Sequence, residues 1–177
     1  IKMSKEKIYI FDTTLRDGAQ TEGVDFSLED KHKIAKVLSE IGVDYIEGGW
    51  PGANPVDTEF FSKSLKLNKS IFTAFGMTKR TGRSAENDPS LAPLISAACP
   101  AVCVVGKAWD FHVKVALGIS NEDNIENIKE TGKHIVKNNK EFLFDAEHFF
   151  DGYKANPDYA LDCLKSAFDQ GARWLVL

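Results

Sequence analysis

Short apolar runs alternate along the chain with longer segments whose hydrophobic residues recur at helical spacing. The apolar runs are rich in β-branched and aromatic residues, which is typical of buried strands. We expect strands at residues 8–12, 45–48, 71–75, 101–105, 141–146 and 174–177. No hairpin turn signal separates them, so the alternation of strand and helix predicts parallel βα units.

Capping residues mark the start of three helices, because a side-chain oxygen or a proline at these positions satisfies the free ends of the first turn. The helices are expected to follow Ser27 with Asp30, Ser120 with Asp123, and Asn156 with Pro157. The first of them places Ile34, Val37, Leu38 and Ile41 on one face, which we expect to be buried. Two further helices are expected at residues 57–67 and 91–98.

Two architectures fit parallel βα units, an open doubly wound sheet and a (β/α)8 barrel. In either one, binding and catalytic residues gather at the carboxyl ends of the strands. The first βα turn lacks a GxGxxG loop, which weakens the dinucleotide-binding interpretation. Polar residues follow four of the expected strands, and we expect them to share one site: Arg16, Asp17, Gln20, Glu47, Lys107, Asp110, His112, Glu147 and His148.

Length and charge narrow the class of protein. The 177 residues are enough for one domain with a sizeable core. A formal net charge of -4 argues against partners such as nucleic acid or an anionic membrane. The three cysteines are irregularly spaced and no apolar run spans a bilayer, so we expect a cytoplasmic protein without a disulfide framework.

Three of the strand-end residues suggest carbon–carbon bond chemistry next to a carbonyl group. Asp17 is a hard oxygen ligand suited to Mg²⁺ or Mn²⁺ and acceptable to Zn²⁺. Its neighbour Arg16 stays charged and can stabilise an oxygen that becomes negative. Glu147 ends a very apolar run, where a carboxylate can serve as a base.

Simpler interpretations of the same residues stay open. Arg16 and Asp17 suit a surface pair at a turn, and Glu47 suits a charge on the rim of a barrel. His148 fits a packed or exposed side chain better than a ligand, and the histidines show no HxH or HxxxH metal spacing. The basic loop at residues 78–83 is expected to be solvated, with contact to coenzyme A phosphates as the alternative.

The segment FDTTLRDG at residues 11–18 resembles the signature of the isopropylmalate synthase, homocitrate synthase and citramalate synthase family. That family is related to HMG-CoA lyase and to the carboxyltransferase domains of pyruvate carboxylase. The similarity runs from residue 8 to the end of the chain. Within the family, YIEGGWPG, GKAWDFH and FDAEHF, at residues 45–52, 106–112 and 144–149, resemble the citramalate synthase branch.

The resemblance implies a (β/α)8 barrel with a divalent metal (Mg²⁺, Mn²⁺ or Zn²⁺) that condenses acetyl-CoA with an α-keto acid. Pyruvate, which gives citramalate, is the favoured keto acid, and the context is isoleucine and leucine biosynthesis. The resemblance also implies residue roles: Arg16 polarises the keto oxygen, Asp17 binds the metal, Gln20, Glu47 and His112 bind substrate alongside Arg16, and Glu147 performs acid–base catalysis.

The chain departs from the family pattern at its end. The family's other metal ligands form a His-x-His on the seventh strand, whereas this sequence stops in the sixth expected strand. A complete barrel needs about 250 residues. We therefore expect residues 1–177 to be the N-terminal part of a barrel, inactive alone and homodimeric when full length. Rival interpretations are an isopropylmalate or homocitrate synthase, a lyase or carboxyltransferase of the same superfamily, and an inactive partial domain.

Overall fold

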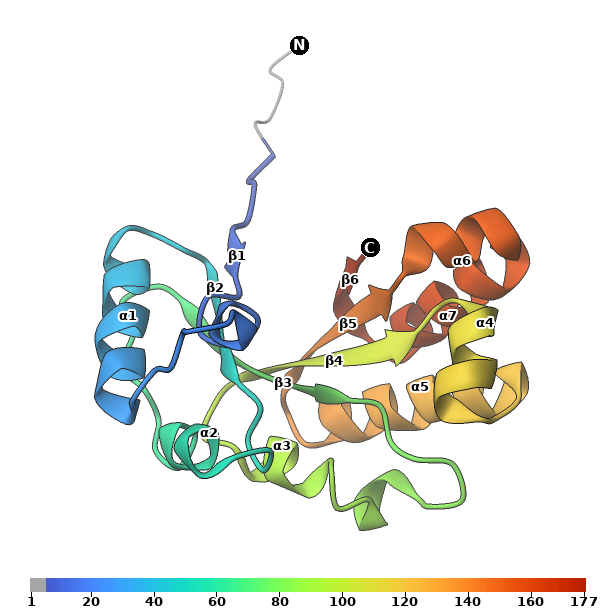
Figure 1. Ribbon diagram of the computed structural model, residues 1–177, viewed down its shortest axis with the longest axis horizontal. Coiled ribbons are helices and arrows are strands. Elements are labelled where there is room, and N and C mark those ends of the chain that lie inside the picture. Colours follow the sequence, from blue (N-terminus) through green and yellow to red (C-terminus); the bar gives the residue numbers. More distant parts are fainter. Residues whose placement is uncertain (1–5) are drawn as a thin grey trace.

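The computed structural model describes residues 6–177 and contains one parallel sheet of six strands in the order β1-β2-β3-β4-β5-β6. The strands curl into a half-barrel (Figure 1). Their bounds are β1 (Phe11–Asp12), β2 (Tyr45–Gly49), β3 (Ile71–Met77), β4 (Ala101–Lys107), β5 (Glu141–Glu147) and β6 (Ala172–Val176). Strand order never reverses, as it does in a doubly wound sheet, so the fold is part of a (β/α)8 barrel.

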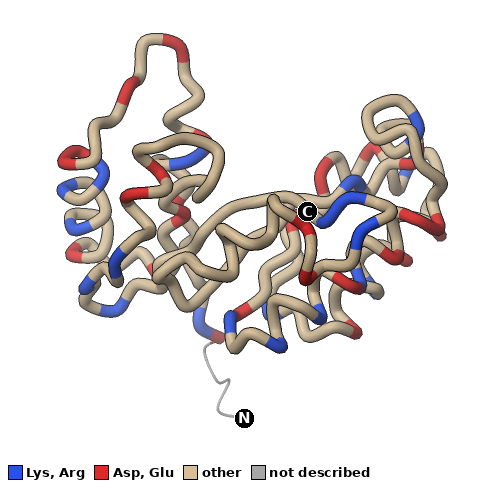
Figure 2. Tube along the Cα trace, turned by 90° about the horizontal axis from the view of Figure 1, so that it is seen from below, with Lys and Arg blue, Asp and Glu red and all other residues tan. Residues whose placement is uncertain are grey.

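Helices cover the outer face of the curved sheet (Figure 1). They are α1 (Leu28–Glu40), α2 (Pro55–Phe60), α3 (Ala92–Ser96), α4 (Asp110–His112), α5 (Asn121–Lys137), α6 (Phe149–Ala155) and α7 (Pro157–Asp169). Shorter turns are η1 (Gly18–Gln20), η2 (Ala85–Asn87) and the π-helical η3 (Val113–Leu117). Figure 2 shows that acidic and basic residues are spread over the helices, while the central strands carry few.

The core has two parts, because successive side chains of a strand point to opposite faces. Phe142 and Phe144 of β5 face the helices and belong to the large cluster between sheet and helices. Leu143, between them, belongs to a smaller cluster inside the curve. There the Trp174 indole donates a 2.9 Å hydrogen bond to the Tyr45 hydroxyl oxygen. Burial and the neighbouring Glu141 carboxylate raise the pKa of Tyr45 to about 12.

The three predicted helix starts are confirmed. Ser27 and Asp30 form a capping box at α1, and the Ser120 hydroxyl accepts the Asp123 amide at 3.0 Å at α5. The Asn156 side chain accepts the amide of Tyr159 at 3.3 Å at the start of α7. These caps are contacts between residues three positions apart, which is why the sequence alone reveals them.

Several predicted bounds are wrong. The first strand pairs only at β1, and Ile8 is 86% exposed, because residues 8–10 extend beyond the β2 pairing. The second helix is α2, which starts at Pro55 since Asn54 caps it, and which ends well before residue 67. In α1, Val37 and Ile41 are exposed instead of buried.

The three cysteines are buried free thiols. In the described part of the chain, no helix has both the length and the apolar character needed to cross a membrane.

Candidate active site

Arg16 lies in the turn after β1 and is held by groups from neighbouring strands. Its Nε donates a 2.7 Å hydrogen bond to Oε2 of Glu47, and its Nη1 donates at 3.1 Å to Oδ1 of Asp17. The guanidinium carbon sits 3.9 Å from the centre of the Phe75 ring. The Arg16 side chain is 17% exposed and that of Asp17 is 63% exposed. The cation is therefore fixed in direction, with one carboxylate behind it and one at the surface.

Glu47 is buried at the end of β2, which rules out the alternative of a solvated rim charge. It is 1% exposed. Burial raises the pKa of its carboxyl group, and the ion pair with Arg16 opposes that shift. This arrangement makes Glu47 the support of Arg16. Its predicted contact with substrate stays a prediction.

Glu147 and Lys107 form an ion pair at the ends of β5 and β4. The two residues are opposite each other in the parallel register, and the Lys107 Nζ donates to Glu147 Oε2. The Lys107 side chain is 17% exposed and that of Glu147 is 36% exposed. Glu147 is thus accessible while its direction is set by the lysine. Lys107 was recognised as a strand-end residue, but no role was predicted for it.

Asp145 is a functional candidate that the sequence analysis missed. It lies two residues before Glu147 on β5, and so faces the inside of the curve as Glu147 does. Burial raises the pKa of its carboxyl group, Arg16 opposes the rise, and Glu147 and Asp17 add to it. The two-residue period of the strand was the signal that points to it.

Gln20 and His112 lie in different surroundings. Gln20 and Arg16 both line a cavity of about 440 Å³, so the structure brings this predicted pair together. His112 instead packs in an aromatic cluster, with its ring centre 4.6 Å from those of Trp109 and His148. Its buried Nδ1 has no hydrogen-bond partner among residues 6–177. His148 is exposed, in agreement with the simpler interpretation.

Lys31 of α1 ties the site to the helices behind it. Its Nζ donates 2.9 Å hydrogen bonds to the carbonyl oxygens of Leu15 and Gly48, and it also donates to the Asp57 carboxylate. The Lys31 and Asp57 side chains are only 5% and 10% exposed. One cation therefore joins the ends of β1 and β2, next to Arg16 and Glu47, to α2. Sequence reasoning missed it because lysine is usually a surface residue.

We expect Lys31→Met to lower the free energy of unfolding of the full-length protein by about 3 kcal/mol, because it leaves the buried Asp57 charge unpaired. Urea denaturation measures this. Lys33→Met is the matched control, since Lys33 pairs with Glu29 on the exposed side of the same helix and should change stability by less than about 0.5 kcal/mol. Adding Asp57→Asn to Lys31→Met should restore part of the loss. Equal effects of the two lysine variants would contradict the anchoring role.

Asp17 offers one oxygen ligand to a divalent metal. Its carboxylate is exposed beside Arg16, which suits an Mg²⁺-type ion that also takes water and substrate oxygens. Within residues 6–177, no group of three or more His, Cys, Asp or Glu side chains is placed to hold a metal ion. The described residues therefore fit part of a metal site.

These features define part of a (β/α)8-barrel domain with a candidate active site at the carboxyl ends of its strands. The chain belongs to the HMGL-like family, whose sequence pattern matches residues 7–177.

Known proteins of this type are similar over nearly the whole chain. The chain is 52% identical to the (R)-citramalate synthase of Aquifex aeolicus, over 97% of this chain and 33% of that protein. It is also 52% identical to the (R)-citramalate synthase of Geobacter sulfurreducens, over 99% of this chain and 33% of that protein. Matching 2-isopropylmalate synthases are 29% to 32% identical. The predicted resemblance to the citramalate synthase branch is confirmed.

A solved structure supports the fold. The HMG-CoA lyase of Bacillus subtilis superimposes with a TM-score of 0.72 at 19% identity, covering 96% of this chain and 57% of that chain. The predicted barrel fold is confirmed. The chain spans about a third of the length of the citramalate synthases that it matches.

Proposed function

We propose that the full-length protein is an acyltransferase that condenses acetyl-CoA with an α-keto acid. Pyruvate is the favoured keto acid, which gives citramalate and places the reaction in branched-chain amino-acid biosynthesis. The observation that carries this proposal is the 52% identity to an (R)-citramalate synthase over 97% of the chain. Residues 1–177 are then the N-terminal part of the catalytic barrel.

Arg16 is the proposed electrophilic group. Glu47 and Asp17 occupy its Nε and Nη1, and a guanidinium group has five N–H donors, so donors are left for the keto oxygen. Attack on the keto carbon turns that oxygen into an alkoxide, which a fixed cation stabilises more than it stabilises the neutral ketone. Glu47 keeps the cation in place, because it cannot turn away without leaving a buried carboxylate unpaired.

A divalent metal held in part by Asp17 would add Lewis-acid polarisation of the keto acid when bound. Gln20 shares the cavity of Arg16 and can orient the keto acid there by hydrogen bonds from its amide. With Arg16, Glu47 and His112, it makes up the proposed substrate-binding set. These residues hold the keto carbon still while the second substrate approaches.

Glu147 is the proposed acid–base residue. It takes a proton from the acetyl methyl group, and the resulting enolate forms the new carbon–carbon bond at the keto carbon. The alkoxide then gains a proton, and water cleaves the thioester to release the free thiol and a carboxylate. Lys107 holds the Glu147 carboxylate in one direction, which suits a group that must meet a methyl carbon at short range.

Thiol release from acetyl-CoA tests the proposal. The full-length protein with Mn²⁺ should release thiol only when a keto acid is present, with the highest kcat/KM for pyruvate among pyruvate, 2-ketoisovalerate and 2-ketoglutarate. Preference for either longer keto acid would indicate an isopropylmalate or homocitrate synthase. Cleavage of 3-hydroxy-3-methylglutaryl-CoA without any condensation would contradict the acyltransferase assignment.

A further inference from the structure

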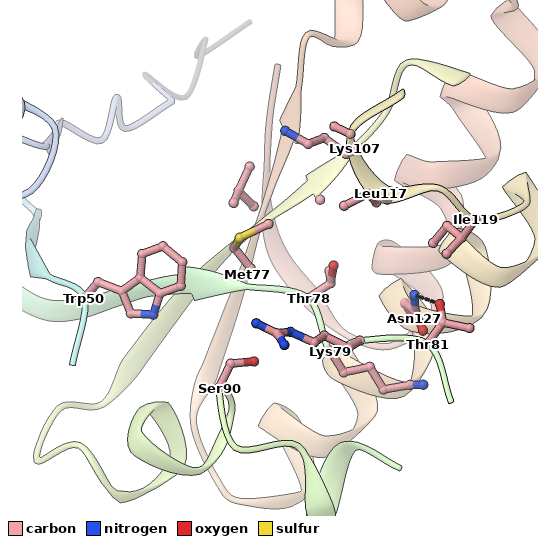
Figure 3. Close-up of a pocket in the computed structure, with 14 residues that line it drawn as sticks. Trp50, Met77, Thr78, Lys79, Thr81, Ser90, Lys107, Leu117, Ile119 and Asn127 are labelled. Carbon is pink, nitrogen blue, oxygen red and sulfur yellow. Dashed lines mark hydrogen bonds between the residues drawn. The ribbon is translucent and has the colours of Figure 1, made fainter. Parts of the chain in front are cut away.

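A second cavity of about 460 Å³ opens beside the candidate site, between the ends of β3 and β4 and the turn η3. Its wall combines apolar side chains with cations (Figure 3): Met77, Val105, Leu117, Lys79, Arg80 and Lys107. None of the described residues that line it is acidic. Part of the wall comes from a π-helical turn, and such turns are frequent at functional sites. The cavity therefore suits an anionic ligand with an apolar portion.

Arg80 is the cation of this wall that has no carboxylate partner among residues 6–177. Lys79 pairs with Glu130 at 2.8 Å and Lys107 pairs with Glu147. Arg80 is exposed and makes no ion pair in the described part of the chain. Its planar guanidinium group matches the oxygens of a phosphate better than an ammonium group does.

The loop that carries Arg80 is fixed by hydrogen bonds. The buried Asp88 carboxylate accepts the amides of Arg80 and Ser90, each at 2.8 Å. The Asn127 amide donates to the Thr81 hydroxyl at 2.8 Å (Figure 3). Lys79 is 6% exposed, so the expectation of a solvated loop is wrong for this residue. A loop ordered in this way needs little further ordering when a ligand binds.

We propose that this cavity holds the pantetheine and phosphate portion of coenzyme A, with Arg80 on a phosphate group and the thioester directed to Glu147. Lys107 lines the cavity and contacts Glu147, so a ligand there reaches the acid–base residue. Trp50 lines both this cavity and the one that contains Arg16 and Gln20. The two substrates would thus meet at Trp50. This inference rests on the proposed function for the identity of the thioester.

Binding of coenzyme A and of pantetheine, which lacks the phosphates, tests the assignment without any reaction. In calorimetric titrations of the full-length protein, Arg80→Met should weaken coenzyme A binding about tenfold, the usual loss for one hydrogen bond to a charged group. It should leave pantetheine binding unchanged. Arg83→Met is the control, because Arg83 lies in the same loop but does not line the cavity, and it should change neither.

Kinetics separate this proposal from its rivals. Arg80→Met should raise the KM for acetyl-CoA about tenfold and leave kcat/KM for acetyl-pantetheine unchanged. Equal losses with both thioesters, a raised KM for the keto acid alone, or the same effect from Arg83→Met would overturn it. If coenzyme A binding depends on Arg80 but no keto acid supports thiol release, the cavity assignment stands and the proposed condensation fails.

Discussion

Arg16→Lys in the full-length protein is expected to lower kcat for the condensation by about 100-fold or more, the usual cost of losing a group that stabilises an oxyanion. A lysine can still pair with Glu47, so the protein should fold. It cannot also donate to Asp17 and to the keto oxygen in one plane, as the guanidinium group does. The measurement is steady-state thiol release with saturating pyruvate and acetyl-CoA.

Arg173→Lys is the matched control for this variant. Arg173 also lies over an aromatic ring, with its guanidinium carbon 4.7 Å from the Trp174 ring centre, but it is on β6 and exposed. Its replacement should leave kcat within about twofold, as is usual for surface changes. If Arg16→Lys keeps near-wild-type kcat, Arg16 has no electrophilic role.

Glu147→Gln is expected to lower kcat by about 100-fold or more while the KM for pyruvate changes by less than about twofold. The substitution keeps the shape of the side chain and removes the group that accepts the methyl proton. The variant also leaves Lys107 without its partner, so Glu147→Gln combined with Lys107→Met separates the lost base from the stranded cation.

Glu141→Gln is the control for this second variant. Glu141 is on the same strand, at the end away from the candidate site, where it accepts a hydrogen bond from Tyr45. Its replacement should leave kcat nearly unchanged. A change in KM alone for Glu147→Gln, with kcat intact, would indicate that Glu147 only binds substrate.

The sequence predicts those parts of the fold that depend on near neighbours along the chain. The caps of α1, α5 and α7 are contacts over three positions, and the parallel strands follow from the alternation of apolar runs and helical stripes. The extent of β1 depends on how far β2 runs beside it, which is a tertiary property. That is why the exposure of residues 8–10 was not foreseen.

The candidate site follows the same division. Arg16, Asp17 and Glu147 could be placed together in advance, because parallel strands in a barrel end on one side. Lys31 could not, since its burial depends on two backbone carbonyl oxygens and on Asp57, none of which is near it in sequence. Asp145 could have been found from its spacing to Glu147. The catalytic roles themselves stay predictions for the variants above.

The order of the strands also has a consequence for how the chain folds during synthesis. Each strand pairs with the one made immediately before it, so each βα unit can dock as soon as it leaves the ribosome. The hydrogen bond between Trp174 and Tyr45 is different, because it joins residues 129 positions apart. Such a long loop closes late. Pairing of the strands can therefore proceed step by step, whereas the bond across the inside of the curve forms only when β6 has been made.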